Sequence, residues 1–159
     1  MKNRFLSALA LIFMTFAATS ATAQEAENTT VLDRWSEDRS LHFDGSEINL
    51  NDFVWRARVL VVFAETEFDP LFQRQIELLD TDLAALAERD VVIVMDTDAD
   101  NRSDLRNALR PRGFGLVLVD KDGRVALRKP QPWDIREISR AIDSTPLRQL
   151  EIEERRDSQ

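Results

Sequence analysis

The sequence predicts an α/β domain in which a central mixed sheet of four strands lies between helices. Residues 59–64 are six consecutive apolar residues, which is typical of a strand buried on both faces. A second apolar run covers residues 91–95. Between the two runs, apolar residues recur at alternate spacings of four and three, as in an amphipathic helix: Phe72, Ile76, Leu79, Leu83 and Leu86. A helix that crosses between two buried strands indicates a parallel pair.

The first 23 residues are expected to lie outside this domain. A basic start, an apolar run over residues 5–18 and small residues ending at Ala23 form the pattern of a secretory signal peptide, cleaved before Gln24. The run is shorter than the roughly 20 apolar residues that a membrane-spanning helix needs. We therefore expect a mature chain of residues 24–159 that is periplasmic or secreted and has no membrane span.

The charge balance restricts the possible partners. The full chain carries a net charge of −8, and without Lys2 and Arg4 of the leader it has 19 basic and 29 acidic residues, a net charge of −10. Such a surface repels nucleic-acid phosphates and anionic lipids, so we expect no nucleic-acid partner. A local basic cluster at Arg106, Arg110 and Arg112 is interpreted as an exposed helix face.

An N-terminal extension, residues 24–49, precedes the central strand. Residues 32–41 are expected to form a short helical turn with Trp35 docked on the domain. The Asp44-Gly45 pair is expected to form a hairpin turn. His42 is the only histidine, and the chain has no cysteine, so we interpret it as a packed or solvated side chain rather than as a zinc ligand.

The remaining elements follow in order from local signals. Asp69 and Pro70 suit the cap and first position of the crossover helix, and Ser103 suits the cap of a second helix. Residues 115–119 and 124–128 are predicted to be strands joined by a tight turn, hence antiparallel. A last helix opens at Trp133-Asp134 with three isoleucines at helical spacing. Residues 151–159 are charged and are expected to fray.

The order is strand, helix, strand, helix, strand, strand, helix. Two parallel strands joined by a crossover, followed by a hairpin and a closing helix, give the thioredoxin topology over residues 50–152, with 153–159 as a charged tail. A ferredoxin-like sandwich is the alternative, but its hairpin falls in the wrong half of the chain.

The redox motif of that fold is missing here. The four positions that carry Cys-Gly-Pro-Cys in thioredoxins are Phe68, Asp69, Pro70 and Leu71. In addition, no proline stands immediately before the third predicted strand, residues 115–119, where thioredoxins carry a cis-proline. A chain without cysteine cannot perform thiol chemistry, and we expect no cofactor.

Four segments give a closer resemblance. They are Trp55-Arg56-x-Arg58 with the strand after it, Arg89-Asp90-Val91-Val92-Ile93, Asp122-Gly123-x-Val125-x-Leu127-Arg128, and Ile142-Asp143-x-x-Pro146-Leu147-Arg148-Gln149-x-Glu151. Together they resemble the P-DUDES family, the thioredoxin/peroxiredoxin-like domain named for the DRS, URB and equarin proteins. The resemblance implies a thioredoxin-like fold, here in an exported bacterial member. The family has no established reaction, so the resemblance implies no catalytic residue.

An acidic loop after the second strand is a candidate metal site. Its carboxylates at alternate positions resemble a calcium loop: Asp96, Asp98, Asp100 and Asp104. The sixth position is Asn101 instead of glycine and the twelfth is Asn107 instead of glutamate. We therefore predict no metal site, since carboxylates at a helix N-terminus are favourable without one.

Function is predicted only in outline. We expect a non-enzymatic binding or accessory protein whose partner is an unknown protein or envelope component. The alternative is an enzyme of unassigned class that uses carboxylates after the central strand, where open α/β sheets place their sites. The catalytic candidates are Glu65, Glu67 and Asp69.

Overall fold

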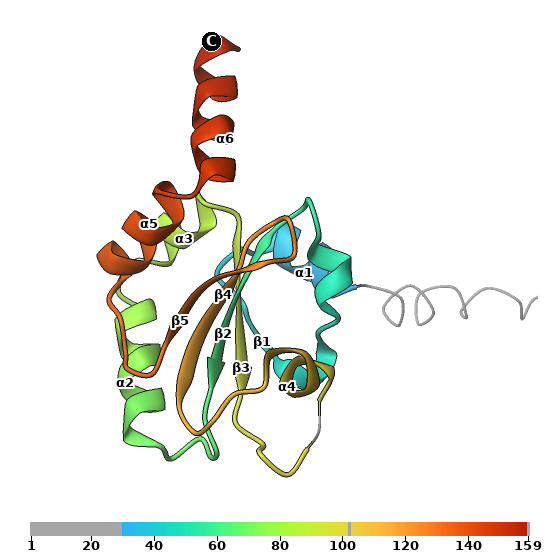
Figure 1. Ribbon diagram of the computed structural model, residues 1–159, viewed down its shortest axis with the longest axis vertical. Coiled ribbons are helices and arrows are strands. Elements are labelled where there is room, and N and C mark those ends of the chain that lie inside the picture. Colours follow the sequence, from blue (N-terminus) through green and yellow to red (C-terminus); the bar gives the residue numbers. More distant parts are fainter. Residues whose placement is uncertain (1–29, 102, 159) are drawn as a thin grey trace, which may run out of the picture.

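A five-stranded mixed sheet in the order β1-β3-β2-β4-β5 runs through the computed structural model (Figure 1). The structure describes residues 30–101 and 103–158, so the predicted signal peptide and its cleavage between Ala23 and Gln24 lie outside the described residues. The strands are β1 His42–Asp44, β2 Arg58–Phe63, β3 Val91–Asp96, β4 Gly115–Val119 and β5 Val125–Lys129. β3 is parallel to both β1 and β2, whereas β4 is antiparallel to β2 and β5 to β4.

The predicted thioredoxin-like fold class is confirmed, but the predicted strand count of four is wrong. The additional strand is β1, in which Phe43 pairs with Val94 of β3. The hairpin expected at Asp44-Gly45 is therefore also wrong. Asp44 instead accepts a hydrogen bond from the Ser46 backbone N–H (2.8 Å) and caps the 3-10 helix η1, Gly45–Glu47.

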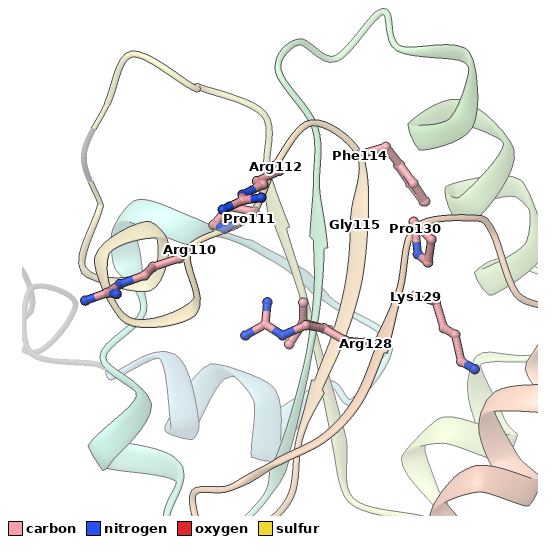
Figure 2. Close-up of a pocket in the computed structure, with 9 residues that line it drawn as sticks. Arg110, Pro111, Arg112, Phe114, Gly115, Arg128, Lys129 and Pro130 are labelled. Carbon is pink, nitrogen blue, oxygen red and sulfur yellow. The ribbon is translucent and has the colours of Figure 1, made fainter.

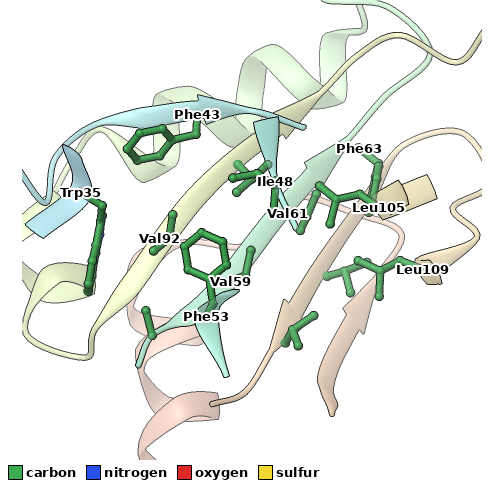
Figure 3. Close-up of a cluster of buried hydrophobic side chains, with 14 residues drawn as sticks. Trp35, Phe43, Ile48, Phe53, Val59, Val61, Phe63, Val92, Leu105 and Leu109 are labelled. Carbon is green, nitrogen blue, oxygen red and sulfur yellow. The ribbon is translucent and has the colours of Figure 1, made fainter. Parts of the chain in front are cut away.

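Strand β2 is the centre of the core because all six of its residues are buried. Alternate side chains point to opposite faces of a strand. Val59, Val61 and Phe63 belong to a first core cluster, shown in Figure 3, and Leu60 and Val62 to a second core cluster. The helices that cover the first cluster's face are α1 Val31–Glu37, η2 Leu50–Phe53 and α4 Asp104–Leu109, and those over the second are α2 Pro70–Leu79, α3 Leu83–Ala87 and α5 Ile135–Asp143.

The crossover between β2 and β3 consists of two helices, so the prediction of one continuous helix is wrong. Asp82 accepts a hydrogen bond from the Ala85 N–H (3.1 Å) and starts α3. Thr81 donates its hydroxyl to the Leu78 carbonyl (2.7 Å). Side chains that bond to nearby backbone groups compete with helix continuation, which explains the break. The apolar stripe still reaches one face of the sheet, since Leu79 and Leu86 are both buried in the second core cluster.

Other local predictions are confirmed. Trp35 on α1 is buried, and its indole N–H lies 3.3 Å from the Val91 carbonyl oxygen, which accepts the hydrogen bond. Asp69 caps α2, Ser103 caps α4, and Asp134 opens α5 with a capping box.

The expected fraying from Glu151 onward is wrong, because helix α6, Pro146–Asp157, continues through it and extends away from the sheet (Figure 1). Within residues 30–101 and 103–158, no helix is long and apolar enough to cross a membrane.

Gly45, the first residue of η1, packs closely against Asp96 at the end of β3. A Cβ added there would lie 2.8 Å from both Cβ and Oδ2 of Asp96. Asp96 is itself held by hydrogen bonds from Ser103 and Arg106, so it has little room to move. We predict that Gly45→Ala lowers the free energy of unfolding by about 1–3 kcal/mol, measured by urea unfolding.

Gly115→Ala is the matched control, because a Cβ at Gly115 meets no atom within 4 Å. This control should stay within about 0.5 kcal/mol of wild type. Equal unfolding midpoints for the two variants would contradict the tight packing at Gly45.

Candidate functional site

The loop after β2 presents apolar side chains to solvent at the positions of the missing redox motif. Phe68 is 80% exposed and Leu71 is 43% exposed. The loop has a defined backbone, since the Asp69 N–H donates to the Thr66 carbonyl (3.2 Å) and the Ala64 N–H donates to the Asp96 carbonyl (3.0 Å). We call residues 64–71 the rim. An exposed phenylalanine on an ordered turn suits contact with a partner better than it suits folding.

The three catalytic candidates lie on the rim but do not form a catalytic pair. The Asp69 carboxylate accepts hydrogen bonds from the backbone N–H groups of Leu71 (2.8 Å) and Phe72 (3.4 Å), so it serves as the helix cap. Glu65 and Glu67 are exposed. Within the described part of the chain, neither glutamate side chain has a hydrogen bond or ion pair. The arrangement supplies a helix cap and two solvated charges.

The four aspartates of the acidic loop have separate roles. Asp96 is buried, and its two carboxylate oxygens accept from the Ser103 hydroxyl (2.8 Å) and from Arg106 Nε (2.6 Å). Asp98 accepts from the N–H groups of the two turn residues that follow Ala99 (3.2 Å each). Asp100 and Asp104 are exposed. Among residues 30–101 and 103–158, no three His, Asp or Glu side chains gather as a metal site would require.

Two further sequence interpretations are resolved by contacts. His42 Nε2 lies 3.4 Å from Asp80 Oδ1, and the imidazole is mostly buried. Arg106 was grouped with Arg110 and Arg112 as an exposed face, which is wrong for Arg106. Its guanidinium turns inward and donates both to Asp96 and to the Ala64 carbonyl (2.6 Å). It therefore links α4 to the start of the rim.

A network of charged residues lies at the opposite end of the sheet. We call it the base cluster: Arg58, Arg89, Asp90, Asp120, Lys121, Asp143, Arg148 and Glu151. Arg58, the first residue of β2, is 0% exposed. Its Nε lies 2.9 Å from Asp120 Oδ1, and another of its nitrogens lies 3.1 Å from Glu151 Oε1. It also donates to the Arg89 carbonyl (2.9 Å), so the buried cation has oxygen atoms of three residues close to it.

Helix α6 is joined to the domain through this cluster. Arg148 is only 2% exposed. It lies 3.2 Å from Glu151 and 3.4 Å from Asp143, while Arg89 donates to both oxygens of Asp143 (2.9 and 2.7 Å). Sequence reasoning missed this network, although its signal was present: six of the eight residues lie in the four segments of the P-DUDES resemblance.

The cluster lowers the pKa of three of its carboxyl groups, those of Asp90, Asp143 and Glu151. Burial by itself raises the pKa of Glu151, but hydrogen bonds from Lys121 and Arg58 outweigh burial and lower the pKa to about 2. For Asp143, burial likewise raises the pKa, but the hydrogen bonds and positive charges of Arg89 and Arg148 together outweigh burial and lower the pKa. No reacting group is evident, so we assign the base cluster to stability.

Comparison with known proteins gives a family and a fold. A domain of unknown function, DUF4174, matches residues 49–151. No curated protein sequence matches the chain significantly.

Solved structures share the fold at low sequence identity. The reduced 2-Cys peroxiredoxin of Plasmodium vivax has a TM-score of 0.51 at 19% identity, covering 63% of this chain and 86% of that one. The mitochondrial 2-Cys peroxiredoxin of Plasmodium falciparum has a TM-score of 0.50 at 14% identity, covering 64% and 85%. Chloroplastic thioredoxin z gives 0.44 at 23% identity over 56% and 80%. At such identities the likeness to the peroxiredoxins shows a thioredoxin-like fold and nothing about activity.

The base cluster predicts a pH dependence. A carboxylate whose pKa is lowered by folding contributes stability above its unfolded pKa, near 4.5 for glutamate, and loses it as the pH falls toward 2. We predict that Glu151→Gln, which leaves the buried Arg58 with one partner fewer, costs about 3–5 kcal/mol at pH 7 in urea unfolding. The deficit relative to wild type should shrink between pH 4.5 and pH 2.

Glu153→Gln on the exposed side of α6 is the matched control, and we expect a change within about 0.5 kcal/mol. A deficit for Glu151→Gln that stays constant from pH 7 to pH 2 would disprove the role of its charge.

Proposed function

Since this chain belongs to the DUF4174 family of unknown function, we propose that it is an exported, non-enzymatic binding or accessory protein that uses the rim of a thioredoxin-like fold as its contact surface. The observation that carries this proposal is Phe68, an aromatic side chain that is 80% exposed at a position where thioredoxins hold a cysteine. Aromatic residues are enriched among those that dominate binding energy. The partner is a protein or another envelope component.

The chemistry of the rim supports binding over catalysis. The chain has no cysteine, so thiol-based redox chemistry is impossible. General acid–base catalysis needs a group held within hydrogen-bond reach of its substrate, and its proton affinity is usually tuned by neighbours. Asp69 already holds the α2 backbone, and the carboxylates of Glu65 and Glu67 have no partner in the described residues. An enzyme based on these carboxylates remains the alternative, and replacing all three by amides would abolish its activity.

The family assignment can be taken one step further. The resemblance to the P-DUDES family covers about residues 50–152, and the DUF4174 match covers residues 49–151. We infer that both describe one domain, of which this chain is an exported bacterial member. The signal-peptide pattern of residues 1–23 supports export, and an acidic surface without disulfides suits the periplasm or the exterior.

Phe68 provides the direct test of the contact surface. Phe68→Ala should leave the melting temperature unchanged because the side chain is exposed. It should reduce retention of envelope components on the immobilised protein by at least about tenfold, quantified by mass spectrometry against wild type.

Trp55→Ala is the matched control, because Trp55 is 69% exposed near the base cluster, at the other end of the sheet. Its retention should equal that of wild type. If both aromatic variants retain the same components as wild type, the rim is not the contact surface.

Export is tested by expression of the full chain in a Gram-negative host. We predict that the protein is recovered in the periplasmic or secreted fraction, with Gln24 at its N-terminus by intact mass. A full-length protein confined to the cytoplasm would contradict export, whereas Ala23→Arg should impair cleavage by placing a large charged residue where a small one is required.

A further inference from the structure

An open cavity of about 240 Å³ lies at the edge of the sheet, where the loop from α4 to β4 meets the end of β5 (Figure 2). It is close to the rim end of the sheet, because Gly115 at its wall pairs with Phe63, the last residue of β2. Pro111, Phe114 and Val117 give it apolar walls. The positive charges in its lining come from Arg110 and Arg112, between α4 and β4, and from Arg128 on β5.

The cavity is surrounded by cations that have no counter-ion. Arg110, Arg112 and Arg128 contribute to its lining, and none of their guanidinium groups has a hydrogen bond or ion pair within residues 30–101 and 103–158. No acidic residue lines the cavity. Arg106 on α4 differs from these three arginines, because its guanidinium donates hydrogen bonds to Asp96 and to the Ala64 carbonyl. Uncompensated guanidinium groups on a chain of net charge −8 indicate a local site for an anion.

The arginines share one side of the sheet edge. Arg128 pairs with Val117 across the β4–β5 ladder, so their side chains lie on the same face. Figure 2 shows Arg110, Arg112 and Arg128 extending toward one side, whereas Lys129 extends toward the other. The Lys129 ammonium lies 4.0 Å from the Trp133 ring centroid and is thus already engaged. The arginines therefore form the cationic side of the cavity.

Gly115 leaves the floor of the cavity open. It lies on the same face as Val117, two residues along β4, and a Cβ built on it meets no atom within 4 Å. Its backbone does not have a positive φ, so a larger residue is sterically allowed there. Gly115 is the first residue of β4, and its missing side chain leaves open space at this end of the strand. That space is available to a bound molecule.

The loop conformation adds a second sign of function. Arg110 has a left-handed backbone, with φ 48° and ψ 58°, at a helix C-cap where glycine would be unstrained. Strained non-glycine residues concentrate at ligand sites. The turn ends α4 and carries the chain through Pro111 and Arg112 to the edge of β4, so the strain lies in the wall of the cavity itself.

We propose that this cavity binds a small organic anion, a carboxylate or phosphate group attached to an apolar body. Arg112 and Arg128 hold the anionic group, because guanidinium groups pair with such oxygens in a fork geometry. The apolar body packs over Gly115 and Val117. The volume is below the range of about 300–1,000 Å³ that is usual for drug-sized ligands, which limits the ligand to a small molecule.

This inference rests on the proposed binding role and adds a ligand class to it, but different experiments test the two. Retention of envelope components by wild type and Phe68→Ala tests the rim, and titration with a small anion tests the cavity. Phe68→Ala should leave the affinity for the small anion within about twofold of wild type, because no contact with Phe68 is invoked.

Phenyl phosphate, titrated calorimetrically into the purified chain, is the probe. We expect saturable binding at one site, at least about tenfold tighter than inorganic phosphate, because only the aromatic ester contacts the apolar walls. The double variant Arg112→Gln/Arg128→Gln should weaken the binding of phenyl phosphate by about tenfold or more.

Gly115→Val should weaken binding as strongly, because the valine side chain fills the floor of the cavity, and it should not lower the thermal stability. Benzoate in place of phenyl phosphate reports whether the site favours carboxylate or phosphate.

Arg124→Gln/Arg136→Gln is the matched control, because both residues are exposed, lie outside the cavity and change the net charge equally. It should bind phenyl phosphate within about twofold of wild type. Three results would each overturn the proposal: absence of saturable binding, equal affinity for inorganic phosphate, or unchanged affinity in both cavity variants. The melting temperature of each variant shows whether it is folded. A loss of binding in a folded variant is then due to the change in the cavity.

Discussion

The structure depends on one buried charge, the Arg58 guanidinium at the start of the central strand. A fully buried cation costs several kcal/mol unless oxygen atoms surround it. Asp120 after β4 and Glu151 on α6 supply those oxygens. The turn between β4 and β5 and the last helix must therefore meet at this point of the sheet. Arg148 and Arg89 extend the same constraint by holding Asp143 at the end of α5.

The two ends of the sheet have opposite electrostatic character. At the base, cations and carboxylates are matched, and the low pKa of Glu151 reflects that match. At the rim end, Phe68 is exposed, and the guanidinium groups of Arg112 and Arg128 have no hydrogen bond or ion pair in the described residues. Groups left unmatched cost stability or solubility in the free protein, so a protein keeps them chiefly where a ligand will meet them.

The sequence predicted those helices and strands whose residues carry a local signal, such as an apolar run or a helix cap. The apolar run 59–64 identified the central strand, and Asp69-Pro70 identified the start of its crossover helix. Strand β1 was missed because its three residues are stabilised only by pairing with β3, far along the chain. Glu151 was misjudged because charges near a C-terminus resemble a solvated tail until their buried partners are known. The cavity was missed because its lining combines Arg112, from the loop before β4, with Arg128 of β5, and only the β4–β5 pairing brings these parts of the chain to one edge of the sheet.

The most direct test of this division is a two-dimensional NMR titration of the ¹⁵N-labelled protein with phenyl phosphate. Amide shifts should change for residues 110–117 and 128–130 around the cavity and stay constant for Arg58, Lys121 and Glu151 in the base cluster. Shift changes centred on the base cluster, or an unchanged spectrum at saturating probe, would contradict the assignment of binding to the rim end of the sheet.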